Sequence, residues 1–161
     1  MENRKRRIQT DKRDARVFST PVGRLKIEVE GDAIAAIART EDVPGGTEHP
    51  LAREAEAQLL EYFKGERTSF DLPLAIQTTP FYREVYEALL RVPYGEVTTY
   101  GDIARAVGRP KAYRAVGGAM RSNKHIIVIP CHRVVPASGG IGNYGGGVAM
   151  KAALLRLERG Q

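Results

Sequence analysis

A polar, proline-punctuated stretch at residues 66–80, ERTSFDLPLAIQTTP, divides the chain into two parts with different patterns. Before it, apolar residues alternate at Leu25, Ile27 and Val29, which is typical of a half-buried strand. After it, glycine and proline repeatedly interrupt short helical patterns. The sequence therefore predicts an α+β fold, with a small amino-terminal antiparallel-sheet-plus-helix subdomain followed by a mostly helical carboxy-terminal domain.

The predicted boundaries follow these changes of pattern. They are a basic, flexible tail at 1–14, an amino-terminal subdomain at 15–70, a linker at 71–78 and a carboxy-terminal domain at 79–161. Helices are expected at about 50–64, 80–91, 100–107, 109–121 and 148–158. The apolar run HIIVIP at 125–130 predicts a short buried strand.

Charge is distributed unevenly along the chain, whose net charge is +6. Residues 91–133 carry eight lysines and arginines against two acids, whereas residues 17–90 carry seven against thirteen. A basic second half is what a polyanion-binding face needs, but a solvated surface rich in lysine and arginine accounts for it equally well.

Several classes of protein are disfavoured. No apolar run approaches the ~20 residues of a membrane span, and the amino terminus has no apolar segment behind its charges, so neither a membrane protein nor a secretory signal is expected. One cysteine cannot form an internal disulfide, which fits a reducing compartment. We expect a soluble intracellular protein, cytoplasmic or, in a eukaryote, nuclear.

The most basic segment contains two helical patterns joined at Gly108, which fits a helix-turn-helix in a winged-helix-like domain, although ordinary helical hairpins are common. The second helix is rich in alanine and glycine, and glycine costs ~1 kcal/mol in a helix interior relative to alanine. This composition indicates close approach of another helix or of a nucleic-acid groove. The spacing of Arg114, Gly118 and Arg121, at i, i+4 and i+7, favours the groove.

The single cysteine lies in VIPCHRVVP, residues 128–136, directly before a histidine. A thiol is mostly protonated at neutral pH, so a nucleophilic Cys131 needs a base or a cationic neighbour, and His132 is the nearest candidate. Adjacent side chains of an extended segment point to opposite sides, so the pair needs a bend or a bridging water. The imidazole also needs an acidic partner, and the only acid after Asp102 is Glu158. A buried, inert thiol is the simpler alternative.

Three motifs around this cysteine, RAVGGAMRSN, PCHRV and GNYGGG, resemble the active-site region of the O6-alkylguanine-DNA alkyltransferases, also called methylated-DNA–protein-cysteine methyltransferases. The resemblance runs from about Thr79 to Glu158, and the amino-terminal part resembles the family only in its strand-strand-helix outline. It implies a monomeric DNA-repair protein that takes the alkyl group of O6-alkylguanine, and of O4-alkylthymine, from double-stranded DNA onto its own cysteine. The resemblance also implies that the transfer is irreversible and needs no cofactor.

The resemblance also implies roles for the residues of the reactive site. Cys131 would accept the alkyl group, His132 would take the thiol proton through a water, and Glu158 would orient the imidazole. Asn123 would brace the active-site turn, and the Tyr100 hydroxyl would donate to the leaving base. The residues implied to form the base pocket are Val134, Tyr144 and Gly145.

The implied DNA contacts are concentrated on the second helix. Arg114 would enter the base stack in place of the extruded nucleotide, and the small residues would let the helix approach the minor groove. The positions implied to contact DNA are Gly101, Arg109, Tyr113, Arg114, Ala115, Gly117, Gly118 and Arg121. Two positions depart from the family's pattern, because Tyr113 replaces a small residue and Gly145 replaces a serine. Some relatives hold a structural zinc in the first half, but this chain shows no set of metal ligands there.

Three other functions remain as alternatives. A non-enzymatic alkyltransferase-like protein that only flags damage would lack the reactive cysteine, so Cys131 argues against it. A cysteine hydrolase built on Cys131, His132 and Glu158 would leave Arg114 and the small-residue helix unexplained. A helix-turn-helix transcription regulator would need side chains that read base edges, where this helix has alanine and glycine.

Overall fold

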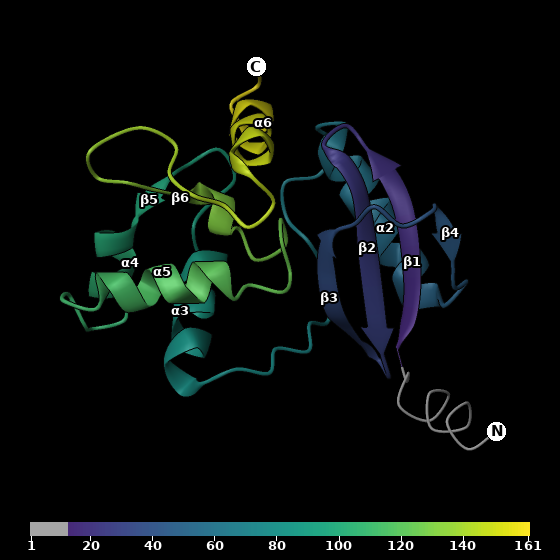
Figure 1. The fold of residues 1–161 in the computed structure, drawn as a ribbon, viewed down its shortest axis with the longest axis horizontal. Helices are drawn as coiled ribbons and strands as arrows, with labels where there is room; N and C mark the ends of the chain where they lie inside the picture. Colours follow the sequence, from purple (N-terminus) through teal and green to yellow (C-terminus); the bar gives the residue numbers. More distant parts are fainter. Residues whose placement is uncertain (1–12) are drawn as a thin grey trace.

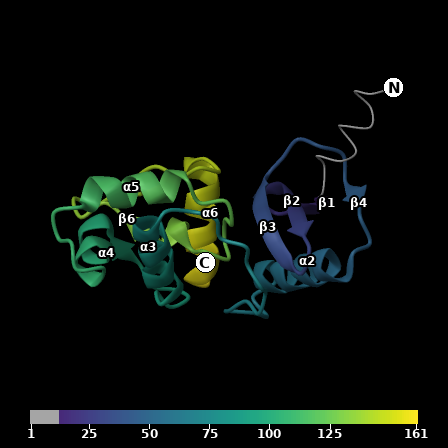
Figure 2. The same ribbon diagram turned by 90° about the horizontal axis from the view of Figure 1, so that it is seen from below.

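The computed structural model describes residues 13–161, so most of the predicted basic tail lies outside the described residues. The amino-terminal part is a four-stranded antiparallel sheet in the order β3-β2-β1-β4, covered on one face by helix α2 (Figures 1 and 2). The elements of this part are β1 (Asp14–Thr20), β2 (Gly23–Glu30), β3 (Ala33–Arg39), β4 (Gly45–Gly46) and α2 (Pro50–Phe63).

The alternation predicted for the second strand is confirmed. Leu25, Ile27 and Val29 of β2 are buried, and the same cluster contains Leu59 and Tyr62 of α2. Pro50 opens α2, with the His49 side chain accepting a hydrogen bond from the Leu51 amide. Burying one face of each element in this way supplies the main stabilisation of the subdomain, because transfer of apolar surface from water dominates folding.

The carboxy-terminal part gathers three helices around a second apolar cluster, and its last helix contributes Met150 and Leu154 to the first cluster. Its elements are α3 (Pro80–Leu90), β5 (Thr98–Thr99), α4 (Tyr100–Ala106), α5 (Tyr113–Arg121), the 3₁₀ helix η1 (Cys131–Arg133), β6 (Val134–Val135) and α6 (Val148–Glu158). Strands β5 and β6 form a small parallel pair. The α+β class predicted from the sequence is confirmed.

The free edge of β3 joins the two parts. The Ile34 amide donates to Pro73 of the linker at 2.7 Å, and the Ile37 amide donates to Lys124 of the carboxy-terminal part at 2.8 Å. The amino-terminal core also includes apolar residues from the far half of the chain, namely Ile126, Ile127, Val128, Met150 and Leu154. The two parts therefore share a core, and each contributes to the stability of the other.

Two secondary-structure predictions are corrected, one in the start of a helix and one in the type of element. The second helix of the basic segment begins at Tyr113, because Arg109 to Ala112 form a turn around Pro110, closed by the Ala112 amide on the Arg109 carbonyl at 2.9 Å. The run 125–130 is a buried turn in which Ile127 has a φ of 74°. An apolar run shows burial but does not by itself distinguish a strand from a compact turn.

Across residues 13–161, no helix combines the length and apolar character that crossing a bilayer requires.

Candidate active site and DNA-binding face

Cys131 lies on a tight turn that Asn123 holds in place. The Asn123 amide nitrogen donates to the Ile129 carbonyl at 2.9 Å and to Sγ of Cys131 at 3.0 Å, and its oxygen accepts from the His125 amide at 2.9 Å. Burial raises the pKa of the Cys131 thiol, and the hydrogen bond from Asn123 opposes that rise. The resting thiol is therefore protonated, and one donor is already in position for the thiolate.

His132 is fully buried, and its Nε2 lies 2.6 Å from Oε2 of Glu158. The 3₁₀ turn supplies the bend that the adjacency of cysteine and histidine required. Burial lowers the pKa of His132, while its contact with Glu158 partly offsets this. Within the described chain, Nδ1 has no hydrogen-bond partner. This arrangement suits a neutral imidazole that donates from Nε2 and can accept a proton at Nδ1.

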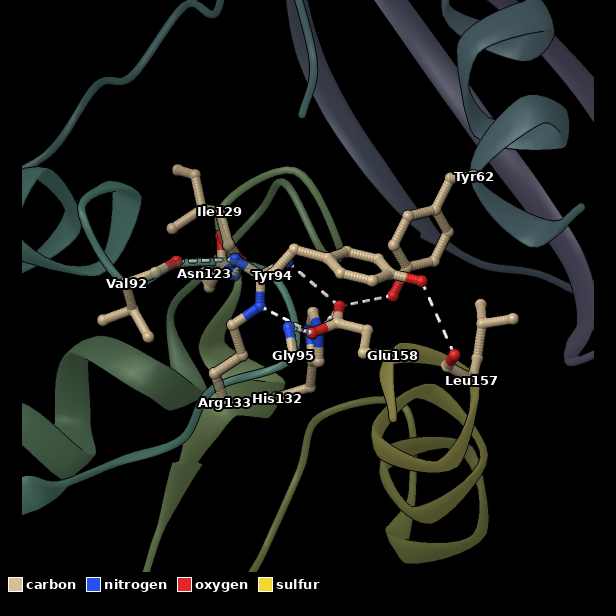
Figure 3. Close-up of polar contacts among 10 residues, drawn as sticks. All are labelled: Tyr62, Val92, Tyr94, Gly95, Asn123, Ile129, His132, Arg133, Leu157 and Glu158. Atoms are coloured by element: carbon tan, nitrogen blue, oxygen red, sulfur yellow. Dashed lines mark hydrogen bonds and ion pairs between the residues drawn. The ribbon is translucent and has the colours of Figure 1, made fainter. Parts of the chain in front are cut away.

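The Glu158 carboxylate receives hydrogen bonds from several directions (Figure 3). Arg133 donates to both oxygens, at 2.8 Å and 3.0 Å, the Tyr62 hydroxyl donates to Oε2 at 2.6 Å, and the Gly95 amide donates to Oε1 at 3.2 Å. Burial opposes ionisation, but the hydrogen bonds from His132 and Arg133 hold the pKa of Glu158 well below its usual range. The carboxylate is therefore a fixed negative charge behind the imidazole.

Arg133 and Tyr62 were missed by sequence reasoning. Arg133 follows the Cys-His pair and is buried with its Nη1 on the Val92 carbonyl at 2.7 Å. A buried arginine requires a carboxylate partner. The position of Arg133 within an apolar run could therefore have indicated that it pairs with a buried acid. Nothing in the sequence indicated a polar contact for Tyr62, because its spacing is that of an ordinary apolar position on α2.

Lys151 is a further buried charge that sequence reasoning missed. Its ammonium group donates to the carbonyls of Val134 at 2.6 Å and Asn143 at 3.2 Å, which ties β6 to the glycine-rich loop. Lys151 has no exposed surface, and burial lowers its pKa. A lysine three and four positions before Leu154 and Leu155 lies on the apolar stripe of α6, and that spacing could have identified it.

A cleft opens in front of Cys131 and joins the thiol to α5. It is lined by the predicted residues Tyr100, Tyr113, Arg114, Gly117, Arg121, Cys131, Tyr144 and Gly145, together with Met120, Pro136, Gly142, Asn143, Gly147 and Val148. Burial raises the pKa of Tyr100 and of Tyr144, so both phenols stay protonated. The Tyr144 hydroxyl has no partner among residues 13–161, and its ring packs edge-on to His132 with centroids 6.4 Å apart.

Other predicted positions lie outside this lining. Val134 is buried behind the thiol, with its carbonyl bonded to Lys151. A Cβ placed on Gly118 would lie 2.5 Å from the Tyr82 hydroxyl of α3, so packing of α5 against α3 explains this glycine. The Arg109 guanidinium lies over the Phe81 ring at 5.4 Å.

Two more predicted positions lie on the helices near the cleft. Gly101 occupies the first turn of α4, and Ala115 is exposed on α5.

Residues 80–160 match the family model described as the DNA-binding domain of 6-O-methylguanine DNA methyltransferase. A Bacillus subtilis protein named methylated-DNA–protein-cysteine methyltransferase, constitutive, is 44% identical over 87% of this chain and 92% of its own length. The chain belongs to the methylated-DNA–protein-cysteine methyltransferase family. A relative of that name from Methanosarcina acetivorans is 39% identical over 88% of this chain and 96% of its own length.

Solved structures support the same assignment. The crystal structure of the Mycobacterium tuberculosis O6-methylguanine methyltransferase superposes with a TM-score of 0.81 at 39% identity, covering 91% of this chain and 92% of that one. A Mycobacterium tuberculosis relative crystallised in complex with DNA gives a TM-score of 0.82 at 39% identity, covering 91% of this chain and 93% of that one.

These comparisons confirm the predicted family and its enzyme class, methylated-DNA–protein-cysteine methyltransferase. They also extend the resemblance beyond residues 79–158, because they include most of the amino-terminal part. In the methyltransferase family the name describes a protein cysteine as the methyl acceptor, and this chain contains one cysteine, Cys131.

Proposed function

We propose that this protein repairs alkylated double-stranded DNA by moving the alkyl group from O6 of guanine, and from O4 of thymine, to Sγ of Cys131. The observation that carries the proposal is that Cys131 opens into the cleft lined by Arg114 and Arg121 while the adjacent His132 is paired with Glu158. The protein acts as a monomer and without a cofactor. Each molecule reacts once, because the thioether product is not reversed.

The proposed chemistry begins with a proton transfer. The Nε2–H of His132 stays hydrogen-bonded to the Glu158 carboxylate, and Nδ1 accepts the Cys131 proton through one water, which leaves a thiolate beside an imidazolium. The thiolate attacks the alkyl carbon, so an S–C bond forms, the C–O6 bond breaks and its electron pair stays on the guanine. The guanine takes up one proton, and the overall exchange is an alkyl group for the thiol hydrogen.

The leaving base is the second element of this proposal. Guanine becomes negative as the C–O6 bond breaks, and a hydrogen-bond donor aimed at the ring lowers the energy of that state. The Tyr100 hydroxyl is assigned this role, which its raised pKa and its position on the cleft wall support. Tyr144 forms another wall. Gly145 offers only its backbone amide, where relatives carry a serine.

Reaching a base inside a duplex requires its extrusion, at a cost of a few kcal/mol. We assign Arg114 to the vacated stack and Gly117 to close approach of α5 to the minor groove, which their shared position on the cleft lining supports. Tyr113, which is 50% exposed, lies where α5 would meet a sugar. The basic charge of residues 91–133 favours this contact with phosphates.

The main alternative is a protein that binds damaged DNA without reacting. Cys131, the Asn123 donor on its sulfur and the His132–Glu158 pair support the reactive function instead, because flagging alone needs none of them.

The test is incubation with a duplex containing O6-methylguanine, followed by proteolysis and mass spectrometry. We expect the methyl group on the peptide that contains Cys131 and unmodified protein in the Cys131→Ser variant. Retained DNA binding with no methylated peptide would identify the flagging function.

A further inference from the structure

Tyr62 of the amino-terminal part reaches the carboxylate that serves the reactive site of the carboxy-terminal part. Its hydroxyl donates to Oε2 of Glu158 at 2.6 Å, across 96 positions of sequence (Figure 3). The tyrosine has no exposed surface, and its ring is packed against Phe63, Phe70 and Tyr94, with centroids 5.3, 5.6 and 6.0 Å away. The hydroxyl is therefore held in one place.

The oxygen that Tyr62 contacts is the one that His132 uses. Oε2 of Glu158 accepts from the Tyr62 hydroxyl and lies 2.6 Å from Nε2 of His132, and Arg133 also reaches it at 3.0 Å. A hydrogen bond to the carboxylate stabilises its charged form and lowers the pKa of Glu158, so each donor makes the carboxylate a weaker attractor for the imidazole proton. The Tyr62 hydroxyl consequently limits how strongly the carboxylate favours a protonated imidazole.

Other charged and titratable groups also face this pair: Arg133 from the turn that carries His132, Lys151 from the helix that carries Glu158, and Tyr144, whose ring packs edge-on to His132. Arg133 and Lys151 lower the pKa of His132, and Glu158 raises it. The Tyr94 hydroxyl bonds the Leu157 carbonyl at 3.5 Å and makes no hydrogen bond to the carboxylate. Tyr62 is thus a neutral donor from α2 that reduces the effect of Glu158 on the pKa of His132.

We propose that Tyr62 is a positioning residue for alkyl transfer, which orients the Glu158 carboxylate and keeps the proton affinity of His132 low enough for a neutral imidazole to receive the Cys131 proton. The inference rests on the proposed function. It makes α2 part of the machinery that prepares the thiol, so the amino-terminal subdomain contributes to the reaction as well as to the shared core.

The test compares Tyr62→Phe with Tyr94→Phe. Both variants lose one tyrosine hydroxyl beside Glu158 and keep the ring, but only the first removes a donor to the carboxylate. The measured quantity is the second-order rate constant for methyl transfer from an O6-methylguanine duplex as a function of pH. Burial raises the thiol pKa and lowers the imidazole pKa, so the acid-side midpoint of this profile reports His132.

In Tyr62→Phe the carboxylate attracts the imidazole proton more strongly, so the pKa of His132 rises. We expect the acid-side midpoint to move upward by about half a pH unit or more, and to stay unchanged in Tyr94→Phe. An unchanged or lowered midpoint in Tyr62→Phe, or equal shifts in both variants, would overturn the proposal.

A second measurement keeps the inference separate from folding and from the proposed function. A ¹⁵N NMR titration of histidine-labelled protein reports the His132 pKa without any transfer, and circular dichroism reports whether each variant is folded. We expect the same upward shift in folded Tyr62→Phe, and its absence would overturn the proposal. If wild-type protein transfers no methyl group, the proposed function fails, while the titration still decides the effect of Tyr62 on His132.

Discussion

Neighbouring side chains set the protonation states around Cys131. Burial favours the neutral thiol and the neutral imidazole, whereas the donors around Glu158 keep that carboxylate charged. A cysteine in apolar surroundings is ordinarily unreactive. Here the Asn123 amide supplies a hydrogen bond to Sγ that stabilises the thiolate. Nδ1 of His132, which has no partner among residues 13–161, is available to accept the thiol proton. The reactivity of Cys131 therefore depends on Asn123, His132 and Glu158 as well as on the cysteine itself.

At this scale we predict the effect of Asn123→Ala. The variant loses the hydrogen bond that stabilises the thiolate, so the thiol pKa rises further and less thiolate is present at any given pH. Loss of a hydrogen bond to a charged group corresponds to about a tenfold slower reaction at neutral pH. The measurement is the rate of alkylation by iodoacetamide against pH, with Ser122→Ala as the control. A profile identical to wild type would contradict the assigned role of Asn123.

Helix α5 has two faces with different tasks. Val116 and Ala119 are buried against the neighbouring helices, and Gly118 meets Tyr82, so this face is defined by packing. The opposite face presents Arg114 and Gly117 to the cleft that contains the thiol. The sequence assigned Gly118 to close approach of a nucleic-acid groove, but in the structure Gly118 packs against α3 and Gly117 faces the cleft.

For this element the prediction concerns Arg114→Ala. If Arg114 fills the base stack, its loss slows transfer from duplex DNA by at least about tenfold and leaves reaction with a free-base O6-alkylguanine analogue nearly unchanged, because a free base needs no extrusion. Both rate constants are measured on the same preparation. Arg159→Ala, an exposed arginine after α6, serves as the control for lost charge. Equal losses on the two substrates would contradict the role of Arg114.

The elements bounded by strong local signals are the ones that the sequence predicted best. Pro50 and the pair Thr79-Pro80 mark helix starts, and both α2 and α3 begin where these signals indicate. The turn at 125–130 was not predictable, because its shape depends on the Ile37 pairing and on Asn123 rather than on its own residues. Tertiary contacts of this kind override local pattern.

In the candidate site, too, residues close to Cys131 in sequence were easier to identify than residues that only the fold brings near it. Asn123 and His132 lie within a few residues of Cys131, so motif reading could bring them together. Tyr62 and Lys151 act through folding that joins remote segments, and no local pattern links either of them to the thiol. Sequence reasoning therefore named Cys131, His132, Asn123 and Glu158, which the structure brings together, and missed the buried side chains Tyr62, Arg133 and Lys151.

At the scale of the molecule, the two subdomains are joined by several independent contacts. The edge of β3 pairs with the linker and with the segment before the active-site turn. Arg39 of β3 donates to the Gly146 carbonyl of the glycine-rich loop at 2.9 Å, and Tyr62 holds Glu158. Unfolding of the amino-terminal part would therefore remove the contact of Arg39 with the loop and the hydrogen bond of Tyr62 to the carboxylate together.

The whole fold should lose stability in mild acid. Burial lowers the pKa of His125 and of His132 in the folded protein, so the unfolded chain binds these protons more readily, beginning near its ordinary histidine pKa of about 6.5. Glu158, whose pKa is lowered by folding, adds a further loss below about pH 4.5. We expect the free energy of unfolding in urea to fall by about 1 kcal/mol or more between pH 7 and pH 5. Equal values at the two pH values would contradict this prediction.

The most direct test of the account is the stoichiometry of transfer. Protein is incubated with an excess of duplex that contains O6-methylguanine, and the intact protein is weighed over time. We predict that every molecule gains one methyl group in place of the Cys131 hydrogen, and that the amount of repaired guanine stops at one per protein. Continued repair beyond one equivalent, or repair without a change in protein mass, would contradict the claim that Cys131 is the acceptor and is consumed.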